Sequence, residues 1–162
     1  MARALIVGCG CRGRTLGREL LARGWAVRGT SRDPRRLEAI EAAGIEPVLA
    51  DPDFVGTVLD RIDGVSLIFW LLGSAAGERE TVVALHTSRL RRLFDKIVDT
   101  PVRGFVYELA TDLEPADAIE AFEVLRHAGD TWRIPYEVVD AGPSDHDLWL
   151  AGMLAAAAEL IG

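Results

Sequence analysis

The sequence predicts an α/β fold, a doubly wound parallel sheet of about six strands with helices on both faces. Short apolar runs alternate with amphipathic segments along the chain, and this alternation is typical of parallel strands joined by helical crossovers. The run 65–72, VSLIFWLL, is apolar throughout, which indicates a central strand buried on both faces. A glycine-rich stretch separates the first apolar run from the first amphipathic segment.

The first half of the chain divides into three strand and helix pairs. Leucines at helical spacing follow the glycine-rich stretch, and Gly24 ends that pattern. Asp33 is expected to be the N-cap of the second helix, with Pro34 at its first position. Strands are expected at 3–8, 25–31 and 45–50, and helices at 14–24, 32–44 and 52–62.

The second half repeats the alternation. Pro101 and Pro115 separate its segments, and apolar residues between 78 and 97 follow helical spacing closely enough to predict one long helix. Strands are expected at 65–72, 103–110 and 134–142, and helices at 78–97, 116–130 and 145–161. The order expected in the sheet is 3-2-1-4-5-6, the arrangement of doubly wound domains.

Composition narrows the classes of protein. A chain of 162 residues with 49% hydrophobic and 27% charged residues fits a single globular domain over 1–162. The net charge of −7, without a basic tract, argues against nucleic acid as a partner. The apolar stretches are shorter than the roughly 20 residues of a membrane span, and the first is too short for a secretory signal. A cytoplasmic protein without membrane insertion is therefore expected.

Three glycines between the first strand and the first helix carry the main functional signal. Gly8, Gly10 and Gly13 form the pattern G-x-G-x-x-G. In this context the first glycine permits a tight turn, the second lets the backbone approach a pyrophosphate, and the third lets helix and strand pack closely. The N–H groups that begin the helix then face the anion. We predict a Rossmann-type dinucleotide site that also includes Cys11 and Arg12; a glycine-rich turn without ligand is the alternative.

Cys9 and Cys11 permit a second interpretation of the same stretch, as a metal or redox site. Zinc usually takes four ligands, and the three histidines of the chain lie at no ligand spacing to one another or near the loop. The Cys-x-Cys pair also lacks the two-residue spacer of the redox motif. No metal site is predicted, and the cysteines are interpreted as small residues in a tight loop, with a thiol activated by the helix N-terminus as the alternative.

The end of the second strand distinguishes NAD from NADP. An acidic residue there accepts hydrogen bonds from the ribose 2′-OH, whereas an arginine accommodates a 2′-phosphate. Asp33 is near the spacing expected for the acid, but it precedes Pro34 and is explained as an N-cap. Thr30 and Ser31 end the strand and Arg32 follows it. Ser31, Arg32 and, in the glycine loop, Arg12 are candidate donors for a phosphate. The sequence therefore favours NADP, with NAD as the alternative.

Two further loops are expected at the same edge of the sheet, because ligands of such folds lie outside the carboxyl ends of the strands. Asp51 follows the third strand and is placed near the adenine. Leu72 and Gly73 follow the fourth strand and are placed beneath the nicotinamide. For each loop, a plain connection is the competing interpretation.

Four stretches carry a family resemblance: ALIVGCGCRGRTLGRELLARGWAVRGTSRDP, GIEPVLAD, GFVYELAT and IPYEVVDAGP. With them the chain resembles the NAD(P)-binding epimerase/dehydratase branch of the short-chain dehydrogenase/reductase superfamily. The resemblance implies a nicotinamide dinucleotide cofactor, a serine or threonine after the fifth strand, and a Tyr-x-x-x-Lys pair on the next helix. In that pair the tyrosine is the acid/base and the lysine lowers its pKa.

The chain departs from this pattern at the catalytic residues. Its single lysine, Lys96, has Arg92 four residues before it, and neither Tyr107 nor Tyr136 has a lysine four residues after it. Of the expected hydroxyl residues only Thr111 is present. A single helix follows the sixth strand, so the substrate-binding segment of the family is not expected.

These observations predict an NADP(H)-binding protein without the usual catalytic pair, with a cofactor-binding or sensing role. The alternative is an atypical oxidoreductase, acting on a small carbonyl or nucleotide-sugar substrate, with Thr111 or Asp112 as its acid. The last helix is rich in small residues that fit against its own sheet or against a second subunit, so a homodimer is a further hypothesis.

Overall fold

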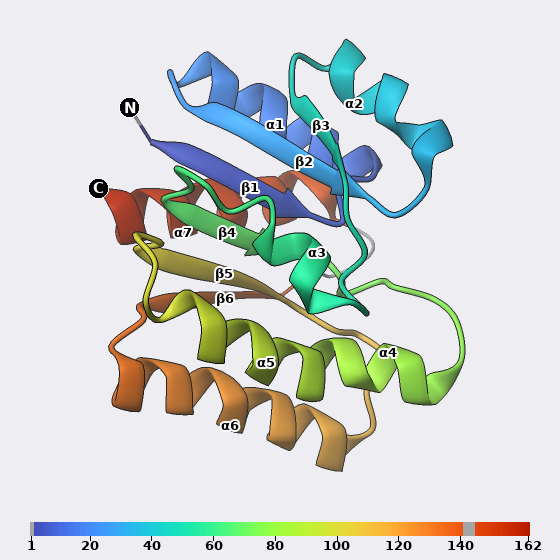
Figure 1. Ribbon diagram of the computed structural model, residues 1–162, viewed down its shortest axis with the longest axis vertical. Helices are drawn as coiled ribbons and strands as arrows, with labels where there is room; N and C mark the ends of the chain where they lie inside the picture. Colours follow the sequence, from blue (N-terminus) through green and yellow to red (C-terminus); the bar gives the residue numbers. More distant parts are fainter. Residues whose placement is uncertain (1, 141–144) are drawn as a thin grey trace.

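The computed structural model describes residues 2–140 and 145–162. Its six strands form one sheet in the order β3-β2-β1-β4-β5-β6, and every neighbouring pair is parallel (Figure 1). The strands are β1 (Arg3–Val7), β2 (Ala26–Ser31), β3 (Glu46–Leu49), β4 (Leu67–Trp70), β5 (Gly104–Leu109) and β6 (Tyr136–Asp140). The predicted fold class and strand order are confirmed.

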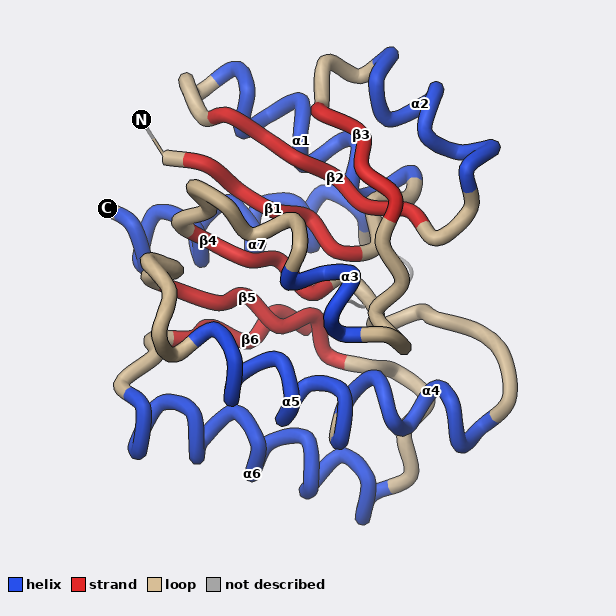
Figure 2. The backbone as a smooth tube through the Cα atoms, viewed as in Figure 1, coloured by secondary structure: helices blue, strands red, loops and turns tan. Residues whose placement is uncertain are grey.

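Helices connect successive strands, so the carboxyl ends of all strands lie along one edge of the sheet (Figure 2). The α-helices are α1 (Cys11–Ala22), α2 (Leu37–Ala42), α3 (Val55–Leu59), α4 (Arg79–His86), α5 (Ser88–Ile97), α6 (Pro115–Trp132) and α7 (His146–Ile161). A short 3-10 turn, η1 (Pro34–Arg36), precedes α2. None of the helices in the described ranges is long and apolar enough to span a bilayer.

Two apolar clusters lie on the two faces of the sheet. One packs α1, α2 and α7 against the face of β1 that carries Ala4 and Ile6. The other packs α3, α4, α5 and α6 against the face that carries Leu5 and Val7. β4 is buried along its whole length between the two layers, as expected for a central parallel strand. Helices therefore cover both faces (Figure 1).

The predicted long helix over 78–97 is wrong, because the chain breaks at Thr87 into α4 and α5. The Thr87 hydroxyl donates to the carbonyl of Val83 at 2.9 Å. The preceding residue, His86, is fully buried and contacts the carbonyl of Leu72. A polar ring that must reach a specific carbonyl outweighs continuation of the helical pattern, and this tertiary contact is not visible in sequence spacing.

Several predicted boundaries also shift. α1 begins at Cys11, three residues before the predicted 14, so the motif's last glycine lies inside the helix. The segment 32–44 starts as a 3-10 turn before α2, but Asp33 is its N-cap as predicted, accepting the N–H of Arg35 at 3.0 Å. The sixth strand is described up to Asp140, and residues 141–142 of the predicted 134–142 lie outside the described ranges.

Candidate cofactor site

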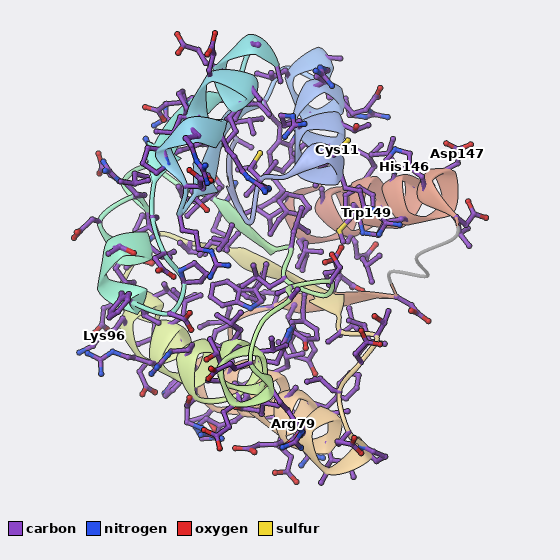
Figure 3. All side chains as sticks on the ribbon, turned by 90° about the vertical axis from the view of Figure 1, so that its right-hand side faces the viewer. Cys11, Arg79, Lys96, His146, Asp147 and Trp149 are labelled. Carbon is purple, nitrogen blue, oxygen red and sulfur yellow. The ribbon has the colours of Figure 1, made fainter. Side chains whose placement is uncertain are left out.

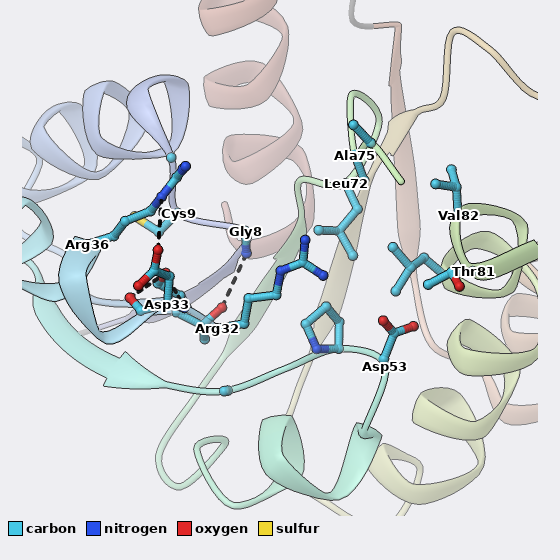
Figure 4. Close-up of a pocket in the computed structure, with 17 residues that line it drawn as sticks. Gly8, Cys9, Arg32, Asp33, Arg36, Asp53, Leu72, Ala75, Thr81 and Val82 are labelled. Atoms are coloured by element: carbon cyan, nitrogen blue, oxygen red, sulfur yellow. Dashed lines mark hydrogen bonds and ion pairs between the residues drawn. The ribbon is translucent and has the colours of Figure 1, made fainter. Parts of the chain in front are cut away.

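A cleft of about 350 Å³ opens at the carboxyl edge of the sheet, between the glycine loop, the ends of β2 and β3, and the start of α4 (Figure 4). Six of the predicted cofactor residues and one more glycine-loop residue line it, together with residues that follow β2, β3 and β4 and residues of α4. The lining residues are Gly8, Cys9, Gly10, Thr30, Ser31, Arg32, Asp33, Arg36, Ala50, Pro52, Asp53, Leu72, Ala75, Ala76, Thr81, Val82 and Leu85.

The glycine loop is held by bonds that leave its helix end open. The N–H of Gly8 donates to Thr30 Oγ1 at 3.2 Å, and the N–H of Cys9 donates to the carbonyl of Thr30 at 2.9 Å. Gly8 has φ +85°, and a Cβ there would lie 2.7 Å from the carbonyl oxygen of Leu71. Gly10 caps α1 without a side-chain acceptor, so the first turn of the helix presents N–H groups suited to an anion.

Cys9 lies beneath the loop, with its side chain packed against Gly29 of β2. It is 3% exposed, and its Sγ lies 2.7 Å from the point where a Cβ on Gly29 would be. Burial raises the pKa of the Cys9 thiol to about 12, so it stays protonated. Cys11, by contrast, is exposed. In the described part of the chain, no group of three or more histidine, cysteine or acidic side chains is placed to hold a metal.

The end of β2 brings arginines and one acid to the cleft. Figure 4 shows Arg32 extending into the cleft, while Arg36 lies against Asp33. The Asp33 carboxylate accepts three hydrogen bonds of 2.9–3.2 Å from the Arg35 guanidinium. These bonds, the Arg35 N–H and the charge of Arg36 lower the pKa of Asp33. Asp33 is therefore already engaged, and the cleft at this end is bordered by Arg32 and Arg36.

The loop after β3 places a different acid in the cleft from the one expected. Asp51 accepts the N–H of Asp53 at 3.0 Å, and its own N–H donates to the Thr57 hydroxyl at 2.8 Å. Asp51 thus shapes the turn and is not among the lining residues, whereas Asp53 and Pro52 are. In Figure 4 the Asp53 carboxylate points into the cleft.

The loop after β4 is tied down by two buried side chains. The Gly73 N–H donates to Glu108 Oε1 at 2.7 Å, and His86 Nε2 lies 3.0 Å from the carbonyl oxygen of Leu72. His86 Nδ1 lies 2.7 Å from the Tyr107 hydroxyl. Burial lowers the pKa of His86 to about 4 and raises that of Tyr107, so both groups are neutral near pH 7.

Arg12 lies on the other side of the glycine loop from the cleft. Its Cζ is 5.2 Å from the centroid of the Trp149 ring, and the Trp149 indole N–H donates to Glu108 Oε2 at 2.8 Å. Gly13 packs against the side chains of Ile6 and Cys9. Cys11, Arg12, Gly13 and Gly73 therefore border the loops of the site without lining the cleft.

The residues that family chemistry requires are dispersed. Thr111 is exposed after β5, and its N–H lies 3.4 Å from the carbonyl of Gly73. Tyr107 and Tyr136 lie in strands, as expected. Lys96 is near the end of α5, at the opposite edge of the sheet from Cys11 and His146 (Figure 3). The helix after β5, α6, contains neither tyrosine nor lysine.

Neither the protein-family models nor the curated protein sequences contain a match to this chain. Solved structures do match. A UDP-glucose 4-epimerase from Thermotoga maritima, solved with UDP-glucose, aligns with a TM-score of 0.68 at 12% identity, over 85% of this chain and 54% of the epimerase. A short-chain dehydrogenase/reductase superfamily protein from Agrobacterium tumefaciens with bound NAD aligns with a TM-score of 0.66 at 21% identity, over 85% of this chain and 48% of that one.

A short-chain dehydrogenase from Streptomyces avermitilis gives a TM-score of 0.65 at 18% identity, over 86% of this chain and 64% of that one. The fold is that of the epimerases and short-chain dehydrogenases. The resemblance inferred from the glycine loop is thus confirmed for the three-dimensional structure. The chain spans about half the length of the Thermotoga epimerase and of the Agrobacterium protein.

Sequence reasoning missed Glu108, Trp149, His86 and Asp53. Glu108 left a signal, because it is a charged residue inside a strand that is otherwise apolar. His86 left none, since its partners lie 14 and 21 residues away in the chain. Asp53 was overlooked in favour of Asp51, the residue nearer the strand.

Proposed function

We propose that the chain binds NADP(H) in the cleft and serves a cofactor-binding or sensing role, without the chemistry of the Tyr-x-x-x-Lys pair. The observation that carries the proposal is the position of Arg32 and Arg36, which both line the cleft at the end of β2. In doubly wound domains this is the place of the adenosine ribose, where arginine accommodates a 2′-phosphate.

The engagement of Asp33 supports NADP over NAD. A carboxylate that accepts from a ribose 2′-OH needs an oxygen turned to the ribose. Both Asp33 oxygens accept from Arg35, and one lies 4.0 Å from Arg36. An incoming phosphate finds Arg32 and Arg36 in the lining of the cleft, and charge-assisted bonds to arginine are strong.

The remaining parts of a dinucleotide have matching surfaces. The pyrophosphate fits the open first turn of α1, formed by Gly10, Cys11, Arg12 and Gly13. The adenine fits between Pro52 and the apolar side chains of α4, where Asp53 offers an acceptor to its amino group. Leu72 and Gly73 then lie on the nicotinamide side. The NAD bound to the Agrobacterium structural neighbour supports this class of ligand.

Titration with NADPH and NADH, followed by the fluorescence of the reduced cofactors, tests the proposal. NADPH is expected to bind more tightly, and R32A or R36A to weaken NADPH at least about tenfold while changing NADH less than about twofold. R126A, an exposed arginine on α6, is the matched control. Absence of binding by either cofactor at millimolar concentration refutes the proposal. Unchanged NADPH affinity in both variants refutes the NADP preference alone.

A second candidate is an atypical NAD(P)H-dependent oxidoreductase. The observation in its favour is the exposed Thr111 next to Gly73, on the nicotinamide side of the site. The measurement is protein-dependent NADPH oxidation with aldehydes, ketones and nucleotide sugars, compared between the natural chain and T111V. Turnover that T111V abolishes supports this candidate, and failure across the panel favours the sensing role.

We also propose a cytoplasmic homodimer that takes a small molecule rather than nucleic acid or membrane as partner. The net charge of −7 supports the proposal that nucleic acid is not a partner. α7 buries Trp149 and Met153 against the sheet and leaves Leu148 71% exposed, which supports an additional contact at its outer side. Gel filtration over a concentration series tests the dimer, and a monomer at every concentration refutes it.

A further inference from the structure

Glu108 is a buried carboxylate near the carboxyl end of β5. It is 3% exposed, and its two oxygens accept the N–H of Gly73 at 2.7 Å and the indole N–H of Trp149 at 2.8 Å. Burial raises the pKa of Glu108, whereas these two bonds and the charge of Arg12 oppose the rise. Because a buried carboxylate is costly unless its partners stay in place, these groups are expected to keep one arrangement.

The bond to Gly73 fixes the backbone that carries a cleft residue. A Cβ on Gly73 would lie 2.7 Å from the carbonyl oxygen of Leu109, so the loop runs close against β5. The preceding residue, Leu72, lines the cleft. A shift of the Gly73 amide away from Glu108 therefore moves the wall of the cleft.

The bond to Trp149 connects the same carboxylate to the glycine loop. Trp149 is 1% exposed, and Arg12 lies over its ring, at 5.2 Å from the centroid. Arg12 belongs to the first turn of α1, directly after the loop. Figure 3 shows Trp149 and Cys11 on facing parts of α7 and α1. The Glu108 side chain thus lies between the two loops that border the site on either side.

We propose that Glu108 is a positioning residue of the cofactor site, because its carboxylate holds the loop after β4 and, through Trp149 and Arg12, the first turn of α1 in the arrangement that binds the cofactor. Glu108 does not line the cleft itself and acts only through these neighbours. The inference rests on the proposed binding of NADP(H).

E108Q is the direct test. A glutamine offers one acceptor oxygen and one NH₂ group, so either Gly73 or Trp149 then faces a second donor. The Kd for NADPH is expected to rise about tenfold, as for the loss of one hydrogen bond to a charged group. E159Q, an exposed glutamate on α7, is the matched control and is expected to leave the Kd unchanged. A folded E108Q protein with unchanged Kd overturns the proposal, even if its Tm is lower.

A double variant separates positioning from a general loss of stability. W149F removes the competing indole donor, so the one acceptor oxygen that E108Q leaves is free to accept from Gly73 again. NADPH affinity in E108Q/W149F is expected to recover to within about threefold of that in W149F alone. If the losses of binding free energy in the two single variants simply add in the double variant, with no recovery, the proposed link between the two partners of Glu108 is contradicted.

Amide hydrogen exchange at Gly73 gives a readout that does not need cofactor. In E108Q this amide is expected to exchange at least about tenfold faster than in the natural chain, because its acceptor is weakened. If the natural chain binds neither cofactor, the proposed function fails, and this rate still decides whether Glu108 holds the loop after β4: unchanged exchange overturns that link. E108D, which keeps the charge but shortens the side chain, replaces E108Q in both measurements if E108Q does not fold.

Discussion

His86 and Tyr107 form a buried hydrogen bond, with 2.7 Å between His86 Nδ1 and the tyrosine oxygen. The other ring nitrogen, Nε2, faces the carbonyl of Leu72 at 3.0 Å. Because a carbonyl only accepts, Nε2 carries the proton and Nδ1 accepts from the Tyr107 hydroxyl; this tautomer is assigned from the partners. One neutral imidazole thus connects the loop after β4 to the centre of β5.

The pH dependence of stability follows from this burial. The pKa of His86 falls from 6.5 to about 4 on folding, so the unfolded chain binds the extra proton between these values. The free energy of unfolding should therefore decrease as the pH falls from 6.5 to 4, by at most about 3 kcal/mol. Urea unfolding of the natural chain and of H86Q measures it. H86Q should be less stable at pH 7, with a flatter pH profile; parallel profiles for the two proteins contradict the assignment.

Substitutions at two glycines of the loop should separate folding from binding. G8A places a Cβ at φ +85° and 2.7 Å from the Leu71 carbonyl, and should destabilise the protein by about 1–3 kcal/mol. The space around Gly10 is open within 4 Å, so G10A should cost less than about 1 kcal/mol. G10A should nevertheless weaken NADPH binding, because a methyl group occupies the path of the pyrophosphate. Thermal unfolding and cofactor titration distinguish the two effects, and tight NADPH binding by G10A would contradict the proposed path.

Thr30 is a polar support of the glycine loop. It is 1% exposed, and its hydroxyl accepts the N–H of Gly8 at 3.2 Å. T30V keeps the shape but removes this acceptor, and should lower the free energy of unfolding by about 1–2 kcal/mol. T15V is the control, because the Thr15 hydroxyl only donates to a carbonyl of its own exposed helix turn. Equal stability of T30V and T15V would show that the Gly8 bond contributes little.

The two cysteines should differ sharply in reactivity. Cys11 is exposed, whereas Cys9 is buried with its pKa raised to about 12, and the thiolate is the reactive form. Iodoacetamide at pH 8 should modify Cys11 alone in the native protein and both residues in denaturant, as measured by peptide mass spectrometry. Native labelling of Cys9 at a rate close to that of Cys11 would contradict the position of its side chain.

Local patterns predict the fold well because each signal is confined to a short stretch of chain. The alternation of strands and helices, the glycine loop and the Asp33 cap depend on neighbours a few residues apart, and all of them appear in the structure. The break at Thr87 was missed because its cause, the His86 contact with Leu72, joins residues 14 apart. Glu108 was missed as a site residue because its partners, Gly73 in the loop after β4 and Trp149 in α7, lie 35 and 41 residues away in the chain.

Local sequence patterns also predicted only part of the candidate site. Sequence placed Thr30, Ser31 and Arg32 at the edge of the sheet, and they do line the cleft. It did not distinguish Asp51 from Asp53, because the direction of each side chain depends on how the turn after β3 closes. In that turn, the Asp51 N–H donates to the Thr57 hydroxyl and the Asp51 carboxylate accepts the N–H of Asp53.

The origin of the cleft's lining residues in the sequence has a consequence for how such a protein can evolve. Every lining residue comes from the segment that ends at Leu85, and the described residues beyond it contribute supports such as Glu108 and Trp149 instead. Among the described residues, the lining of the cleft is thus encoded in the first half of the gene, whereas the second half adds supports to it. A recombined or redesigned second half that preserves those few supports inherits the cleft intact, so new partners or reactions can be acquired without rebuilding it.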